Sequence, residues 1–202
     1  MRILTPNKIS IKVANTIIVH HPELNKKKDE IRYGLEWIIS GLFQVVLTII
    51  AAIPLGVALE AIVILISGAV LRMFSGGAHA RGYFRCLFLS LIQIIGISLV
   101  VKYTTVLDEY TYFCLFLLFI SIIIIFIKAP VLHKKKDMFT DKEKRKLKYL
   151  SLFTFGTLYA FSYLPYLSEF QYCIWLSLIL QSFTLTFVWE KILSYGENFI
   201  YK

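Results

Sequence analysis

A histidine and a cysteine lie seven residues apart in the segment 72–86, and this pair is suited to nucleophilic catalysis. A thiol attacks a carbonyl as its thiolate, and an imidazole beside it can take and return the proton. We assign Cys86 as the candidate nucleophile and His79 as the candidate general base. If a helix begins just before Cys86, the partial positive charge of its end favours the thiolate. Arg81 and Arg85 add positive charge on both sides.

The spacing of the pair sets a condition on the backbone between them. In an unbroken helix, seven residues rise about 10.5 Å, so His79 and Cys86 would share a face without touching. Gly76, Gly77 and Gly82 supply the backbone freedom for a turn. We therefore predict that His79 lies on a loop or a broken helix, and that free N–H groups at the start of the next helix form an oxyanion site.

Plainer interpretations of the same residues stay open. A cysteine and a histidine this close in sequence are often unrelated, and Arg72, Arg81 and Arg85 could serve only as topology anchors. A metal site is disfavoured, because one His and one Cys supply half of a zinc shell, and we expect no metal and no cofactor. Cys114 and Cys173 lie in apolar segments and are expected to be packing residues.

The composition indicates a membrane protein. Of the 202 residues, 57% are hydrophobic and only 17% are charged, whereas soluble domains carry about 25% charged residues. Long stretches have almost no charge, and the net charge of +9 gathers in a few short segments. We expect an all-α integral membrane protein in the lipid bilayer, with residues 1–202 forming one membrane domain. Because the orientation of the chain in the membrane accounts for most of the positive charge, this charge does not by itself indicate nucleic-acid binding.

Six spanning helices are predicted, because each needs about 20 mostly apolar residues. Residues 37–71 hold two short helices broken near Pro54-Leu55-Gly56, and the other spans are 83–101, 110–127, 149–167 and 170–189. The domain is thus divided into an interfacial helix (1–22), the first four spans with the catalytic segment (31–127), a basic segment (128–148) and the last two spans (149–189).

The N-terminal segment is predicted to form an amphipathic helix at the membrane surface. Thr5 is suited to the N-cap and Pro6 to the first helical position. Ile9, Val13 and Ile17 then lie on one face, as in helices that rest in the interface.

The distribution of Lys and Arg predicts the orientation. Segment 23–32 holds four, segment 72–85 three and segment 128–148 nine, whereas the alternate connections hold only Lys102. Basic loops stay in the cytoplasm. The catalytic segment and both termini are therefore expected on the cytoplasmic side.

Polar residues inside the predicted spans are few. Glu60 lies in the outer half of the second span, and we expect it to be structural or to serve assembly. Gln44, Gln93 and Gln181 are candidates for hydrogen bonds between helices.

The run Arg72…Gly76-Gly77-Ala78-His79…Cys86 resembles the signature of the AgrB family, including its seven-residue step from His to Cys. Lys128-Ala129-Pro130 with the basic segment after it is also similar to that family, as are the length and the hydrophobic layout. One departure is Lys128, where many relatives have an aromatic residue. The resemblance covers nearly the whole chain, and its most specific part is the Gly-Gly-x-His-x6-Cys element.

The resemblance implies a bacterial cell-membrane cysteine peptidase acting in quorum sensing. Its substrate would be an AgrD-like propeptide with an amphipathic leader, a central Cys and an acidic C-terminal tail. Cys86 would attack the carbonyl before the tail, and the propeptide's own Cys would then resolve the acyl-thioester into a thiolactone. The family also suggests a homodimer. Lys134, Lys135 and Lys136 could bind the acidic tail, although topology alone would also account for them.

Two functions from other classes compete with the peptidase. A small peptide transporter or export subunit would account for Glu60 and the intramembrane glutamines, and the His–Cys element would then be incidental. A structural partner in a sensor complex is the third. Loss of propeptide cleavage on substituting either His79 or Cys86 would separate the peptidase from both.

Overall fold

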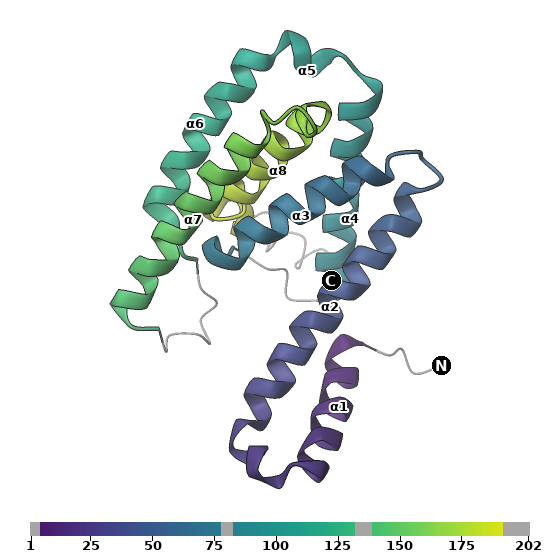
Figure 1. Ribbon diagram of the computed structural model, residues 1–202, viewed down its shortest axis with the longest axis vertical. Helices are drawn as coiled ribbons and strands as arrows, with labels where there is room; N and C mark the ends of the chain where they lie inside the picture. The colour runs from purple at the N-terminus through teal and green to yellow at the C-terminus, as the bar shows by residue number, and fades with distance from the viewer. Residues whose placement is uncertain (1–4, 78–82, 132–138, 192–202) are drawn as a thin grey trace.

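The computed structural model describes residues 5–77, 83–131 and 139–191, and every regular element within these ranges is a helix. The predicted all-α class is confirmed. Figure 1 shows a body of packed helices from which the α1–α2 hairpin projects. The helices are α1 (Pro6–His20), α2 (Lys28–Ala52), α3 (Ala58–Ser75), α4 (Tyr83–Tyr103), α5 (Val106–Glu109), α6 (Thr111–Lys128), α7 (Asp141–Phe161) and α8 (Gln171–Phe183), with 3-10 turns at Pro22–Lys27 and Ser168–Phe170.

The start of α1 follows the predicted capping pattern. The Thr5 side chain accepts a hydrogen bond from the Lys8 backbone N–H, and Pro6 occupies the first helical position. The hydroxyl satisfies one of the N–H groups that a helix start leaves free, and proline needs no such partner there. The predicted N-terminal helix and its cap are confirmed.

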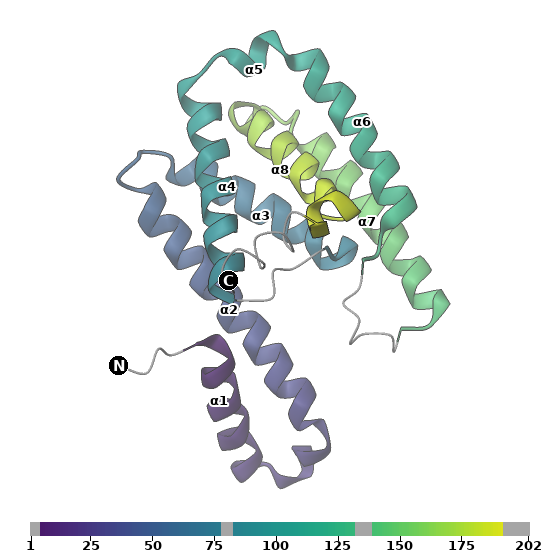
Figure 2. The same cartoon turned by 180° about the vertical axis from the view of Figure 1, so that it is seen from behind.

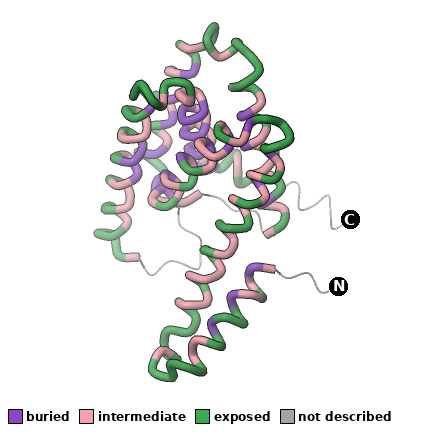
Figure 3. The backbone as a smooth tube through the Cα atoms, turned by 45° about the vertical axis from the view of Figure 1, so that its right-hand side comes forward, coloured by how far each residue is buried: buried purple, intermediate pink, exposed green. Residues whose placement is uncertain are grey.

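A small-residue face joins α1 to α2. Ser10 and Ala14 are fully buried, whereas Val13 is exposed. The Asn7 amide also donates to the Glu36 carboxylate of α2 at 2.9 Å. Small side chains let two helices approach closely. The face of α1 that packs on α2 is therefore the one with Ser10 and Ala14, and the face predicted for the membrane surface, which includes Val13, points elsewhere. Figure 3 shows that most of this hairpin outside the α1–α2 seam is exposed or only half-buried.

Within the described residues, four helices are long and apolar enough to cross a membrane: α3, α4, α6 and α2 together with the turn before it (Pro22–Ala52). The predicted break near Pro54-Leu55-Gly56 is confirmed, because α2 ends at Ala52 and α3 begins at Ala58. The remaining predicted spans correspond to α7 and α8. These two helices begin and end at other residues than the sequence pattern predicts.

The boundaries of α7 are set by local chemistry. Thr140 and Glu143 form a reciprocal capping box, which starts the helix inside the charged segment at Asp141 rather than near residue 149. Hydrogen bonds from the backbone and hydroxyl of Thr140 lower the pKa of the Glu143 carboxyl. At the other end, Pro165 follows Phe161 and disfavours further helix. Residues 141–148 of the basic segment are therefore helical.

Helix α8 lies at the centre of the body and packs mainly against α3 and α6, with smaller contacts to α4 and α7 (Figures 1 and 2). Over half of its residues are buried, among them Trp175 and Leu178. The Trp175 indole donates to the Ser162 hydroxyl at 2.9 Å, and the Ser177 hydroxyl donates to the Ile64 carbonyl of α3 at 2.8 Å. A helix of only 13 residues can be central here because it is enclosed by other helices rather than by lipid.

An ion pair closes the end of the body opposite the glycine segment. The Lys102 ammonium, at the end of α4, lies 2.9 Å from the Glu60 carboxylate in the first turn of α3. The same ammonium donates to the Gly56 carbonyl, and the Tyr103 hydroxyl donates to the Leu55 carbonyl at 2.8 Å. Glu60 is therefore explained as structural, because it fixes the α2–α3 turn onto the end of α4.

Replacing Lys102 with methionine is expected to destabilise the fold. The Glu60 side chain is only 13% exposed, and its second oxygen is buried without a hydrogen-bond partner among the described residues. Removing the ammonium leaves a mostly buried carboxylate without its partner, at a cost of about 1–3 kcal/mol. The double variant Glu60→Gln/Lys102→Met should recover most of that loss in thermal unfolding measured in detergent. Equal melting temperatures for the single and double variants would contradict this role.

Candidate functional site

Cys86 lies in the first turn of α4, because the helix begins at Tyr83. It is half-buried, whereas Cys114 and Cys173 are 3% and 0% exposed. The prediction that these two cysteines are packing residues is confirmed. A nucleophile has to reach its substrate, and among the three cysteines Cys86 alone offers an accessible thiol.

Two neighbours interact electrostatically with Cys86. One is Arg72 in the last turn of α3, and the other is Tyr83 in the same turn of α4. Arg72 therefore places a positive charge near the thiol. The Tyr83 hydroxyl is buried and has no hydrogen-bond partner among the described residues, so it keeps a donor available. The sequence indicated Arg72 as a supporting residue, but it gave no signal for the hydroxyl.

The glycine pair forms a sharp exit from α3, as predicted. Gly76 has φ +69° and Gly77 has φ +141°, a backbone region that side-chain-bearing residues rarely adopt. A Cβ atom on Gly76 would lie 2.1 Å from the Val131 carbonyl oxygen, and one on Gly77 would lie 2.7 Å from the Thr184 hydroxyl. Both positions therefore require glycine for conformation and for space.

Three segments that are far apart in the sequence meet at this exit. The Val131 backbone N–H donates to the Ser75 carbonyl at 2.9 Å, and the Gly77 N–H donates to the Val131 carbonyl at 3.2 Å. This bridge joins the end of α3 to the residues after α6. From α8, the Gln181 amide donates to the Ser75 hydroxyl at 3.1 Å and to the Gly76 carbonyl at 2.8 Å. The prediction that Gln181 hydrogen-bonds between helices is confirmed.

Several predicted site residues lie outside the described residues. These are His79, Arg81, Lys134, Lys135 and Lys136. The positions of His79 on a loop and of the lysines at a peptide tail therefore stay predictions. Arg85 is described and is half-buried in the first turn of α4.

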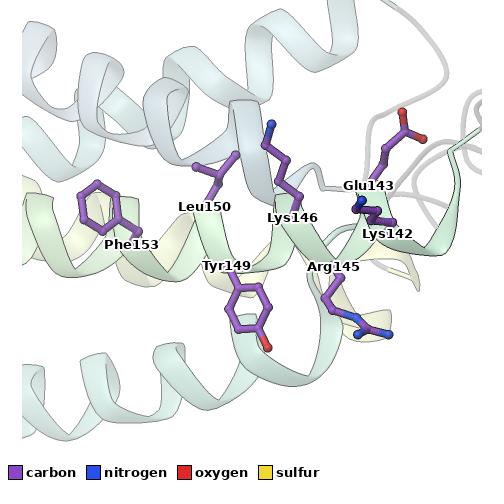
Figure 4. A pocket seen from close by; sticks show the side chains of 7 residues that line it. All are labelled: Lys142, Glu143, Arg145, Lys146, Tyr149, Leu150 and Phe153. Atoms are coloured by element: carbon purple, nitrogen blue, oxygen red, sulfur yellow. The ribbon is translucent and has the colours of Figure 1, made fainter.

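An open groove of about 580 Å³ lies on the exposed side of α7. All seven of its lining residues come from that single helix, as Figure 4 shows. Arg145 and Tyr149 point to one side of the helix, and Lys146 and Leu150 point to the other. The groove is a surface of one helix and includes neither Cys86 nor the glycine exit.

Comparison with known proteins gives a consistent family. The model of the family described as accessory gene regulator B (AgrB) matches residues 10–185. The chain belongs to the AgrB family. An AgrB-like protein of Clostridium perfringens strain SM101 is 31% identical over 195 residues, covering 88% of this chain and 90% of its own.

Two further relatives carry the same family name. A second AgrB-like protein, from Clostridium perfringens strain 13, is 32% identical over 63% of this chain and 62% of its own. One from Lactiplantibacillus plantarum is 26% identical over 61% of each chain. No solved structure matches the chain. AgrB membership and the four apolar helices make this a membrane protein of a peptide quorum-sensing system.

Proposed function

We propose that this AgrB-family chain is a membrane cysteine endopeptidase that cleaves the C-terminal tail from a short AgrD-type propeptide. Cys86 is the nucleophile and His79 is the general acid and base. The observation that carries the proposal is the setting of Cys86, which is half-buried in the first turn of α4 and interacts with Arg72. The other two cysteines are buried in the helix packing.

The proposed topology has six spans, with α7 and α8 as the last two and both termini in the cytoplasm. Support comes from the helix ends that the glycine bridge brings together. The ends of α3 and α6 meet where Gly76 pairs with Val131, and these ends carry Arg72 and Lys128. Lys102 lies at the opposite end of α4. By the positive-inside rule, the bridge and Cys86 face the cytoplasm. The active form is proposed to be a homodimer.

In the first proposed step, the Cys86 thiolate attacks the carbonyl carbon that joins the central segment to the tail. The tetrahedral oxyanion is held by N–H groups at the start of α4. The carbon–nitrogen bond then breaks while the His79 imidazolium gives its proton to the leaving amine. The products are the free tail and an acyl-thioester on Cys86.

In the second proposed step, the propeptide's own Cys attacks that thioester. Its proton passes to His79, a new carbon–sulfur bond closes the thiolactone ring, and the Cys86 thiolate leaves. Exchange between thioesters is nearly neutral, whereas trading a peptide bond for a thioester is uphill. Removal of the tail must therefore draw the reaction forward, and water must be kept from the acyl-enzyme.

Trapping the acyl-enzyme tests this function. The protein is reconstituted in vesicles with a propeptide whose central Cys is replaced by alanine, so that the second step cannot occur. Intact-mass analysis after acid quench should find the N-terminal fragment attached to Cys86, released by hydroxylamine and missing from Cys86→Ala. Tail release by the wild type with no adduct, or with an adduct on Cys114, would contradict the proposal.

A further inference from the structure

Gln181 makes a buried polar contact between α8 and the end of α3. Its side chain is 5% exposed, and its amide group donates to the Ser75 hydroxyl at 3.1 Å and to the Gly76 carbonyl at 2.8 Å. Both amide protons are thereby used. An apolar side chain in its place would leave the Gly76 carbonyl without this donor in a region enclosed by helices.

The acceptors of Gln181 lie at a critical place in the chain. Ser75 is the last residue of α3, and Gly76 is its C-cap, where the backbone turns with φ +69°. Thr184, one turn beyond Gln181, fills the space beside Gly77 and donates to the Gln181 carbonyl at 2.7 Å. Helix α8 thus fixes both the start and the direction of the exit from α3.

This anchor limits where the predicted base can lie. Gly77 precedes His79 by two residues, and two residues span at most ~7 Å of extended chain. A shift or rotation at Gly77 therefore changes the region that the His79 backbone can reach. Misplacement of a reacting group by about 1 Å can reduce the rate of a reaction about 100-fold.

We infer that Gln181 is a positioning residue of the site, whose amide fixes the Ser75–Gly77 exit and thereby the point from which the chain continues to His79. This inference rests on the proposed function. Helix α8 thereby acts on the reaction by holding Ser75–Gly77 in place rather than by contacting the substrate. The expected signature is a loss in kcat with the KM for the propeptide preserved.

The test uses Gln181→Met, which keeps the length of the side chain and removes the donors, and Gln181→Asn, which keeps the amide but shortens its reach. Both are assayed for tail release in vesicles. We expect kcat to fall about 10- to 100-fold, with KM within about twofold. The matched control is Gln44→Met, because Gln44 is half-buried in α2 and, among the described residues, its amide donates only to Thr48 of the same helix, at 3.5 Å.

Thermal unfolding separates a positioning role from loss of fold. We expect both Gln181 variants to melt below the Gln44 variant, because they lose or weaken buried hydrogen bonds, but to stay folded at the assay temperature, where kcat is compared per folded molecule. Unchanged kcat in a folded Gln181 variant, or a rise in KM at constant kcat, would overturn the inference. Cys86→Ala in the same vesicles keeps the outcomes distinct. If Cys86→Ala is inactive while Gln181 variants match the wild type, only the positioning role fails; if Cys86→Ala is active, the proposed function fails.

Discussion

Cys86→Ala is expected to reduce propeptide cleavage at least ~10⁴-fold, because removal of a covalent nucleophile leaves only binding and oxyanion stabilisation. His79→Ala should lose about 10²- to 10⁴-fold, the usual contribution of a general acid and base. The measurement is the initial rate of tail release in vesicles with equal amounts of inserted protein.

The two buried cysteines provide the matched controls for this prediction. Cys114→Ala and Cys173→Ala each remove a thiol of the same kind from a helix, and both cysteines are buried in the packing. They should lower stability slightly through lost packing and keep cleavage within about threefold of the wild type per folded molecule. A cleavage rate of Cys86→Ala within tenfold of the wild-type rate would contradict the assignment of Cys86 as the nucleophile.

Gly76→Ala is expected to disrupt both the fold and the activity. The methyl group would lie 2.1 Å from the Val131 carbonyl oxygen, which is a backbone atom that cannot rotate away, and the residue would still need φ +69°. The strained backbone alone costs about 1–3 kcal/mol, and breaking the α3–α6 bridge adds to it. We expect a clear fall in the melting temperature and loss of tail release.

Gly96→Ala is the control for that substitution. Gly96 lies inside α4, and nothing lies within 4 Å of a Cβ atom built there. Because alanine is a better helix former by about 1 kcal/mol, this variant should be as stable as the wild type or slightly more stable. Equal melting temperatures for the Gly76→Ala and Gly96→Ala proteins would show that the fold does not depend on the Gly76–Val131 bridge.

The elements that position the site were largely predictable from the sequence. The break between α2 and α3, the cap of α1 and the placement of Cys86 in a first helical turn all follow from local patterns of apolar, proline and glycine residues. The start of α7 at Asp141 was not predicted, because the hydropathy pattern marks only the apolar span from residue 149, whereas the Thr140–Glu143 capping box needs no apolar residue.

The sequence by itself determined the helical membrane class, the family and the pair of residues proposed for catalysis. These depend on composition and on short spacings, which act over one or two turns of chain. Only the tertiary structure decided which polar groups meet: Gln181 with Ser75 and Gly76, and Lys102 with Glu60. The physical reason is that apolar helices look alike in hydropathy, so partners are chosen by close packing and by the need to satisfy each buried polar group.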